Sequence, residues 1–151
     1  MEFEHLLEVN EAAAPVLDRD MLWFGLLCRA EDARPFLPGL DSCRIIARTE
    51  GELVRELHFG AALIRDRVIL GAPDWIRFES EASSAHAGGS LTISIEEQGS
   101  VLLLRFHYQT SLGDASREEA ACADFVRSAY CQSDFDTLNV IRALVTAKPV
   151  H

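Results

Sequence analysis

Hydrophobic and polar side chains alternate at the start of the chain. One parity holds Phe3, His5, Leu7 and Val9, and glutamates occupy most of the positions between them. Because successive side chains of a strand point to opposite faces, this period of two predicts a first strand with one buried face.

Short helices are expected after this strand. Asp18 or Asp20 can cap a helix, and the apolar residues that follow are Met21, Leu22, Trp23, Leu26 and Leu27. Pro35 and Pro38–Gly39 then stop any further helix and turn the chain.

From Ser42 to Ser111 the chain repeats one pattern, in which runs of strand-forming residues are separated by turn residues at intervals of roughly ten. The turn segments are Thr49–Gly51, Gly60, Gly71–Pro73, Ser83–Ser90 with its Gly88–Gly89 pair, and Glu97–Gly99. This spacing is typical of an antiparallel meander of six strands. With the first strand, the predicted sheet has seven.

The period changes after Gly113–Asp114. Ser116 and Glu119 fit a capping box, and apolar residues recur at helical spacing as far as Val145. A helix of about 30 residues extends roughly 45 Å, which suits an element that spans a whole sheet. We therefore expect a single α+β domain over residues 1–151, in which a curved antiparallel sheet wraps around a long C-terminal helix.

This order of elements resembles the helix-grip fold of the SRPBCC superfamily, which includes START domains, birch-pollen-allergen-like proteins and polyketide cyclases, and the resemblance covers nearly the whole chain. Phe36–Leu40, and Arg55–Gly60 leading into Ile64–Val68, are similar to phrases in a small microbial family with AtaL-like members. The resemblance implies a cavity between sheet and helix that holds an apolar or amphipathic small molecule. It transfers no catalytic motif, so the catalytic residues are unknown.

The residues themselves also suggest a cavity. On the helix, about 100° per residue places bulky Phe125 at one end of an inward stripe whose centre is Ala129, Ser133 and Thr137. Small side chains there leave room for a ligand, unless larger sheet residues fill the gap. The sheet residues expected to face this stripe are Leu91, Ile93, Ile95, Leu102, Leu104, Phe106 and Tyr108.

Polar candidates share parity with these inward residues. A buried Tyr108 phenol needs a partner or a wet cavity, and a backbone carbonyl is an equally common partner. His5 is either a hydrogen-bonded core histidine or a polar group of the cavity. Arg55 shares parity with Leu53, Leu57 and Phe59, which makes it the likeliest inward arginine and a candidate partner for a ligand carboxylate. The competing interpretation is a set of cross-strand ion pairs on a solvated face.

Composition narrows the class of partner. The chain of 151 residues has 48% hydrophobic and 25% charged residues, which is ordinary for a globular protein. With 24 Asp and Glu against 14 Lys and Arg, its formal charge of −10 argues against nucleic acid and anionic lipid as partners. The acidic N-terminus is unlike a signal peptide and no apolar run is long enough to cross a membrane, so we expect a cytoplasmic protein.

No motif indicates a metal or a cofactor, and we expect neither. The four cysteines, Cys28, Cys43, Cys122 and Cys131, form no CxxC pair, and the five histidines lack metal-ligand spacing, so reduced cysteines are expected. Phosphate-binding, dinucleotide-binding and nucleophile-elbow signatures are also missing. Asp134 and Asp136 lie about 200° apart on a helix and cannot act as a pair.

The run Val101–Leu104 is apolar on both parities, although an antiparallel strand with one solvated face should alternate. A homodimer contact is one explanation, and the alternative is a strand of high propensity with scattered exposed aliphatic residues. The function predicted from these observations is the binding of a small hydrophobic or aromatic molecule. The alternatives are a cyclase- or lyase-like enzyme acting on a polyketide-type or aromatic intermediate in the same cavity, and an interaction module that works through the outer strand.

Overall fold

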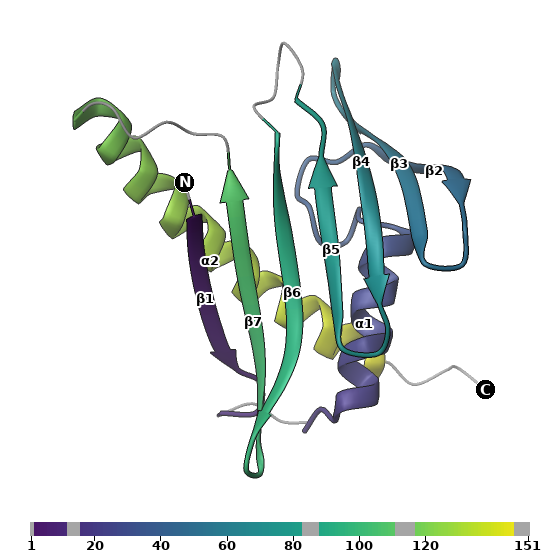
Figure 1. The fold of residues 1–151 in the computed structure, drawn as a ribbon, viewed down its shortest axis with the longest axis vertical. Helices are drawn as coiled ribbons and strands as arrows, with labels where there is room; N and C mark the ends of the chain where they lie inside the picture. The colour runs from purple at the N-terminus through teal and green to yellow at the C-terminus, as the bar shows by residue number, and fades with distance from the viewer. Residues whose placement is uncertain (1, 12–15, 83–87, 111–116, 147–151) are drawn as a thin grey trace.

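A computed structural model describes residues 2–11, 16–82, 88–110 and 117–146, with side chains in the last segment described from residue 127. Within these described residues, seven strands and two helices follow one another (Figure 1). They are β1 (Glu2–Glu8), α1 (Arg19–Glu31), β2 (Ser42–Arg48), β3 (Glu52–Phe59), β4 (Ala62–Gly71), β5 (Trp75–Ser80), β6 (Gly89–Gln98), β7 (Val101–Thr110) and α2 (Arg117–Thr146). The predicted α+β helix-grip class is confirmed, although one helix of 13 residues replaces the expected short helices.

The strands form one antiparallel sheet in the order β1-β7-β6-β5-β4-β3-β2. The meander is therefore confirmed, and β1 joins its far edge, where His5 lies opposite Phe106 and Leu7 opposite Leu104. Gly60 and Gly99 occupy the left-handed region at φ values of 57° and 60° in two of the hairpin turns, a conformation that glycine adopts without steric cost.

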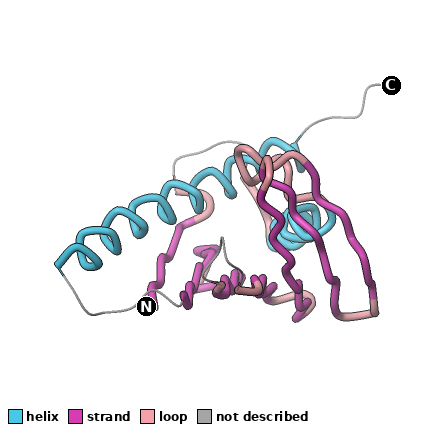
Figure 2. The backbone as a smooth tube through the Cα atoms, turned by 90° about the horizontal axis from the view of Figure 1, so that it is seen from above, coloured by secondary structure: helices cyan, strands magenta, loops and turns pink. Residues whose placement is uncertain are grey.

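The sheet bends so that both helices lie on its concave side (Figure 2). Asp18 caps α1 by accepting a hydrogen bond from the Met21 amide at 2.8 Å. The two helices touch at Gly25, where an added Cβ would lie 2.4 Å from Cγ2 of Ile141. A side chain at Gly25 would therefore force the helices apart.

The parity of the central strands is confirmed by burial. Ile93, Ile95, Leu104 and Phe106 are buried, with side chains of α1 and α2 in the same apolar core. Leu102, at the start of β7, is half-buried against that core. These residues follow one face of the sheet, as the alternation predicts.

The predicted face of α2 is only partly correct: Thr137 is buried and Ser133 is half-buried, but the rest of the face differs. Ala129 is exposed, and the buried positions are Asp134, Thr137, Leu138 and Ile141. This face is rotated by roughly 90° from the predicted stripe, because the polar Asp134 belongs to it and small residues do not mark its centre. The Phe125 side chain lies outside the described residues.

On the outer face of β7, only some of the apolar side chains are exposed to solvent. Leu103 is buried within the chain, between Glu8 and Glu96 of the neighbouring strands, whereas Val101 is exposed. A homodimer contact stays a prediction.

Other predictions concern reactive groups and membranes. Cys28, Cys43 and Cys131 are free, and within the described ranges no group of three or more His, Cys, Asp or Glu side chains could hold a metal ion. Cys122 lies among the residues whose side chains are not described. No helix in the described part of the chain is long and apolar enough to cross a membrane.

Candidate functional site

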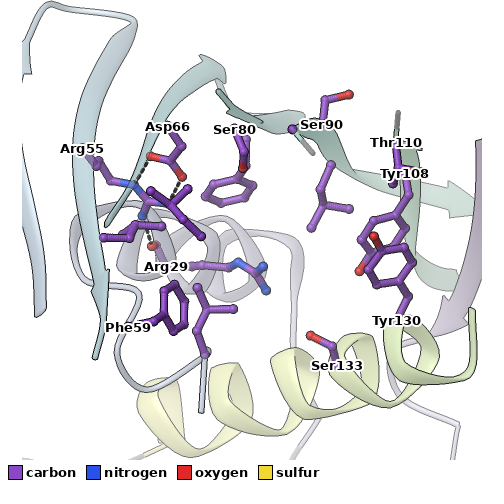
Figure 3. Close-up of a pocket in the computed structure, with 17 residues that line it drawn as sticks. Arg29, Arg55, Phe59, Asp66, Ser80, Ser90, Tyr108, Thr110, Tyr130 and Ser133 are labelled. Atoms are coloured by element: carbon purple, nitrogen blue, oxygen red, sulfur yellow. Dashed lines mark hydrogen bonds and ion pairs between the residues drawn. The ribbon is translucent and has the colours of Figure 1, made fainter. Parts of the chain in front are cut away.

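A cavity of about 270 Å³ lies between the concave face of the sheet and the two helices (Figure 3). It occupies the end of the sheet where β5 stops and β6 starts, next to the last residues of β7. Its lining residues are Arg29, Leu37, Arg55, Leu57, Phe59, Ile64, Asp66, Phe78, Ser80, Gly88, Gly89, Ser90, Leu91, Tyr108, Thr110, Tyr130 and Ser133. The lining is mostly apolar, with a few polar groups brought in by different elements.

Arg55 is an inward arginine, as its parity predicts, and is 2% exposed. Its guanidinium donates two hydrogen bonds, of 2.9 and 2.5 Å, to the carboxylate of Asp66 on β4. The Nη1 nitrogen of Arg55 donates hydrogen bonds to the backbone carbonyls of Arg29 and Ala30 in the last turn of α1. Both competing interpretations thus hold in part, because Arg55 faces inward and also forms a cross-strand ion pair. The pair ties the end of α1 to the sheet.

Arg29 comes from that last turn of α1 and is 7% exposed. Its Nη1 donates a hydrogen bond of 2.6 Å to the Thr137 hydroxyl on α2. The guanidinium lies 5.0 Å from the centre of the Phe78 ring and 5.8 Å from that of Phe36. Figure 3 shows its end directed into the cavity. Burial lowers the pKa of Arg29, and Tyr108 and Asp134 act in the opposite direction.

A chain of three polar groups joins the first strand to the cavity. His5 Nδ1 lies 3.0 Å from Oδ2 of Asp134, and the Tyr108 hydroxyl donates a hydrogen bond to Oδ1 of the same carboxylate. The Asp134 side chain is 1% exposed, and the His5 side chain 19% exposed. His5 therefore connects the buried carboxylate to the surface, while Tyr108 connects it to the cavity.

Burial sets the proton affinities in this chain of groups. Desolvation raises the pKa of Asp134 to about 6, against the opposing influence of its hydrogen bonds from Tyr108 and His5 and of the charge of Arg29. Desolvation, followed by the nearby Asp134 carboxylate, raises the pKa of Tyr108, so the phenol keeps its proton. Asp134 is thus the group that can change its protonation state close to neutral pH.

Aromatic rings form one wall of the cavity. Tyr108 of β7 and Tyr130 of α2 stack with ring centres 4.0 Å apart and planes 2° from parallel. Phe3 stands behind both rings, at 6.1 Å from Tyr108 and 6.4 Å from Tyr130. The wall offers a planar apolar surface next to the end of Arg29 (Figure 3).

The structure brings only some of the predicted site residues to this cavity. Arg55, Leu91, Tyr108 and Ser133 line it. His5 reaches it only through Asp134, and Thr137 is buried against Arg29. The residues that pack into the core instead are Ile93, Ile95, Leu102, Leu104 and Phe106. The reason is α1, whose buried Leu22 and Leu26 belong to the same core as those strand residues and occupy part of the space under the sheet.

Most of the lining residues were not predicted from the sequence. Among the residues that sequence reasoning missed, three bear on the chemistry, namely Arg29, Tyr130 and Asp134, which reaches the cavity through Tyr108. The spacing of residues along the helices contained a signal for Arg29 and for Asp134. Arg29 follows Leu22 and Leu26 on one face of α1, and Asp134 lies four residues from both Tyr130 and Leu138. Asp136 instead lies 3.0 Å from the Gln132 side-chain nitrogen, so the expected separation of Asp134 and Asp136 is confirmed.

Comparison with solved structures supports the fold. The chain is similar to the di-domain ARO/CYC StfQ from the steffimycin biosynthetic pathway, with a TM-score of 0.70 and 13% identity over 94% of this chain and 50% of that one. It is also similar to the Zhui aromatase/cyclase from Streptomyces sp. R1128, with a TM-score of 0.61 and 18% identity over 96% and 93%. Ara h 8.0201 gives a TM-score of 0.65 and 13% identity over 98% and 99%. The chain thus spans about half the length of StfQ and nearly all of the other two.

Sequence comparison places the chain in a family. No curated protein matches it significantly. The model of AtaL, acetylaranotin biosynthesis cluster protein L, matches residues 4–148. Because that match covers almost the entire sequence, the chain belongs to the AtaL family.

Proposed function

We propose that the protein reversibly binds a small hydrophobic or aromatic molecule in the cavity between the sheet and α2. The observation that carries this proposal is the cavity of about 270 Å³ itself, whose lining surface is mainly apolar. Protein interiors are normally close-packed, so a space of this size beneath a buried face is a candidate binding site.

The size of the cavity suits a molecule of one to three rings. Each Å² of apolar surface that such a ligand removes from water contributes about 25 cal/mol, before the cost of ordering the complex. The Tyr108–Tyr130 wall suits a flat ring, and Ser133 offers a hydroxyl at its edge. The similarity of the fold to the ARO/CYC StfQ and the aromatase/cyclase Zhui supports an aromatic or polyketide-type ligand.

The neutral fluorescent probe N-phenyl-1-naphthylamine tests this proposal. Ser133→Leu adds bulk inside the cavity and should weaken probe binding about tenfold or more. Ala129→Leu adds similar bulk at an exposed position of the same helix and serves as the matched control. Equal probe affinity in the two variants and the wild type would contradict the proposal.

A second candidate function is an enzyme that acts on a polyketide-type or aromatic intermediate in the same cavity. The observation that favours it is the chain from His5 through Asp134 to Tyr108. A carboxylic group with a pKa of about 6 can hold or release a proton at neutral pH, and the partly exposed His5 can exchange that proton with water. Tyr108 would present a hydroxyl to a ligand carbonyl.

A turnover assay distinguishes the enzyme from the binding protein. Molecules that co-purify with the protein are identified by mass spectrometry and then offered back as substrates to the wild type and to Asp134→Asn. An enzyme of this kind should lose turnover about 100-fold or more in the variant while it keeps ligand binding. Binding without turnover in the wild type contradicts the enzyme and leaves the binding protein.

Location and assembly are part of the proposal. We propose a cytoplasmic protein without a nucleic-acid partner, which forms a homodimer through the outer face of β7 and the neighbouring β1, where Val101 of β7 and Leu6 of β1 are exposed. Size-exclusion chromatography with light scattering tests the dimer, and a monomer at high protein concentration contradicts it.

A further inference from the structure

The charged side chains at the cavity differ in how completely they are neutralised. Arg55 and Asp66 form a closed pair with two hydrogen bonds between them. Asp134 accepts from Tyr108 and lies within hydrogen-bond distance of His5. Arg29 has a single hydrogen bond among the described residues, and its partner there, Thr137, is uncharged. No carboxylate of the described residues forms a hydrogen bond or ion pair with Arg29, although the charges of Asp134 and Asp66 act on it from a distance.

This arrangement is energetically unusual. A guanidinium keeps its charge in proteins and offers five N–H donors, so removing it from water without a counterion is costly. The rings of Phe36 and Phe78 flank the group and offset part of that cost, but rings accept no strong hydrogen bonds in the plane of the fork. The end of the fork points into the cavity (Figure 3). An anion in the cavity would complete this environment.

We infer that the ligand of this cavity is a small aromatic molecule with an acidic group, whose anionic oxygen accepts hydrogen bonds from Arg29. This inference rests on the proposed binding function and adds the chemical class of the ligand. The ring of such a molecule lies against the Tyr108–Tyr130 wall, and its acidic group lies at the end of the fork. Arg55 takes no part in this contact, because its donors are directed to Asp66 and to α1.

The test uses two competitors of equal shape and different charge. Naphthalene-2-carboxylate and naphthalene-2-carboxamide each displace N-phenyl-1-naphthylamine from the protein at pH 7.5. The wild type should favour the carboxylate about tenfold or more, because charge-assisted hydrogen bonds are stronger than neutral ones. Arg29→Gln should abolish this preference, so that the ratio of the two competitor affinities falls to about one.

Arg65→Gln is the matched control. It removes the same charge from the exposed Arg65 of β4, which pairs with Glu56 away from the cavity, and should leave the carboxylate preference intact. A preference of equal size in the wild type and Arg29→Gln overturns the inference. The inference is also overturned if the wild type binds the neutral probe but shows no preference for the carboxylate over the carboxamide. If the neutral probe does not bind the wild type at all, the proposed function is overturned as well.

A second measurement tests the inference on the wild type, in case the Arg29→Gln variant does not fold. In nitrogen-detected spectra of the wild type, the carboxylate should shift the Arg29 Nε signal, assigned through the folded Arg29→Lys variant, and the carboxamide should leave it in place. An Arg29 signal that responds to neither molecule overturns the inference.

Discussion

Arg29 of α1 and Arg55 of β3 are both buried and both line the cavity, but their hydrogen-bond partners differ. Arg55 donates to a carboxylate and to two carbonyls at the end of α1, whereas Arg29 donates to one hydroxyl and points into open space. A buried charge with a full set of partners holds a fold together. A buried charge that forms no direct ion pair with the described residues has a different role, which we propose is to bind the ligand.

Breaking the closed pair should have the largest effect. Asp66→Asn leaves Arg55 buried without a charged partner, and loss of one member of a buried ion pair costs about 3–5 kcal/mol. Urea denaturation should therefore show a large drop in the free energy of unfolding. A loss below about 1 kcal/mol, which is the range of a surface pair, would mean that Arg55 is not structural.

The corresponding change at the open arginine should have a much smaller effect. Arg29→Met keeps the length of the side chain and removes the uncompensated charge, so the free energy of unfolding should change by less than about 1 kcal/mol or rise. The same denaturation experiment measures it. If Arg29→Met loses as much stability as Asp66→Asn, the contrast between the two arginines is wrong.

A third effect concerns pH and the third buried charge, Asp134. Because the pKa of Asp134 is about 6 in the folded protein and about 3.9 in an unfolded chain, folding takes up a proton between these values. Asp134 therefore makes the protein less stable as the pH rises from about 4 to about 6, and the contribution is constant above that range.

Asp134→Asn removes this titration and keeps an acceptor for Tyr108, while its amide N–H replaces the carboxylate oxygen that faces His5 and requires the His5 ring nitrogen to accept. The stability of the wild type relative to the variant should fall between about pH 4 and 6, as followed by thermal unfolding at each pH. A difference that rises over this range would show that the partners of Asp134, namely His5, Tyr108 and Arg29, stabilise its ionised form more than burial destabilises it.

The sheet could be predicted from the sequence because alternation is a local property. The inward parity of Leu91, Ile93 and Ile95 follows from the strand alone, and the same rule turns Arg55 inward. The partners of Arg55 could not be found in this way, since they depend on where α1 ends over the sheet.

The helices were harder to predict, because their charged residues belong to the buried faces. Asp134 and Arg29 interrupt apolar faces with charges, so a search for apolar or small residues excludes both and rotates the predicted face of α2 toward Ala129. Their burial depends on contacts between elements far apart in the sequence, such as His5 with Asp134 and Arg29 with Thr137. No local pattern contains such pairs.

A crystal structure of the full chain with naphthalene-2-carboxylate tests the central claim most directly. We predict the ring against Tyr108 and Tyr130, the carboxylate within hydrogen-bond distance of Arg29, and the Arg55–Asp66 pair unchanged. A cavity filled by protein side chains, or a carboxylate bound away from Arg29, would contradict the account.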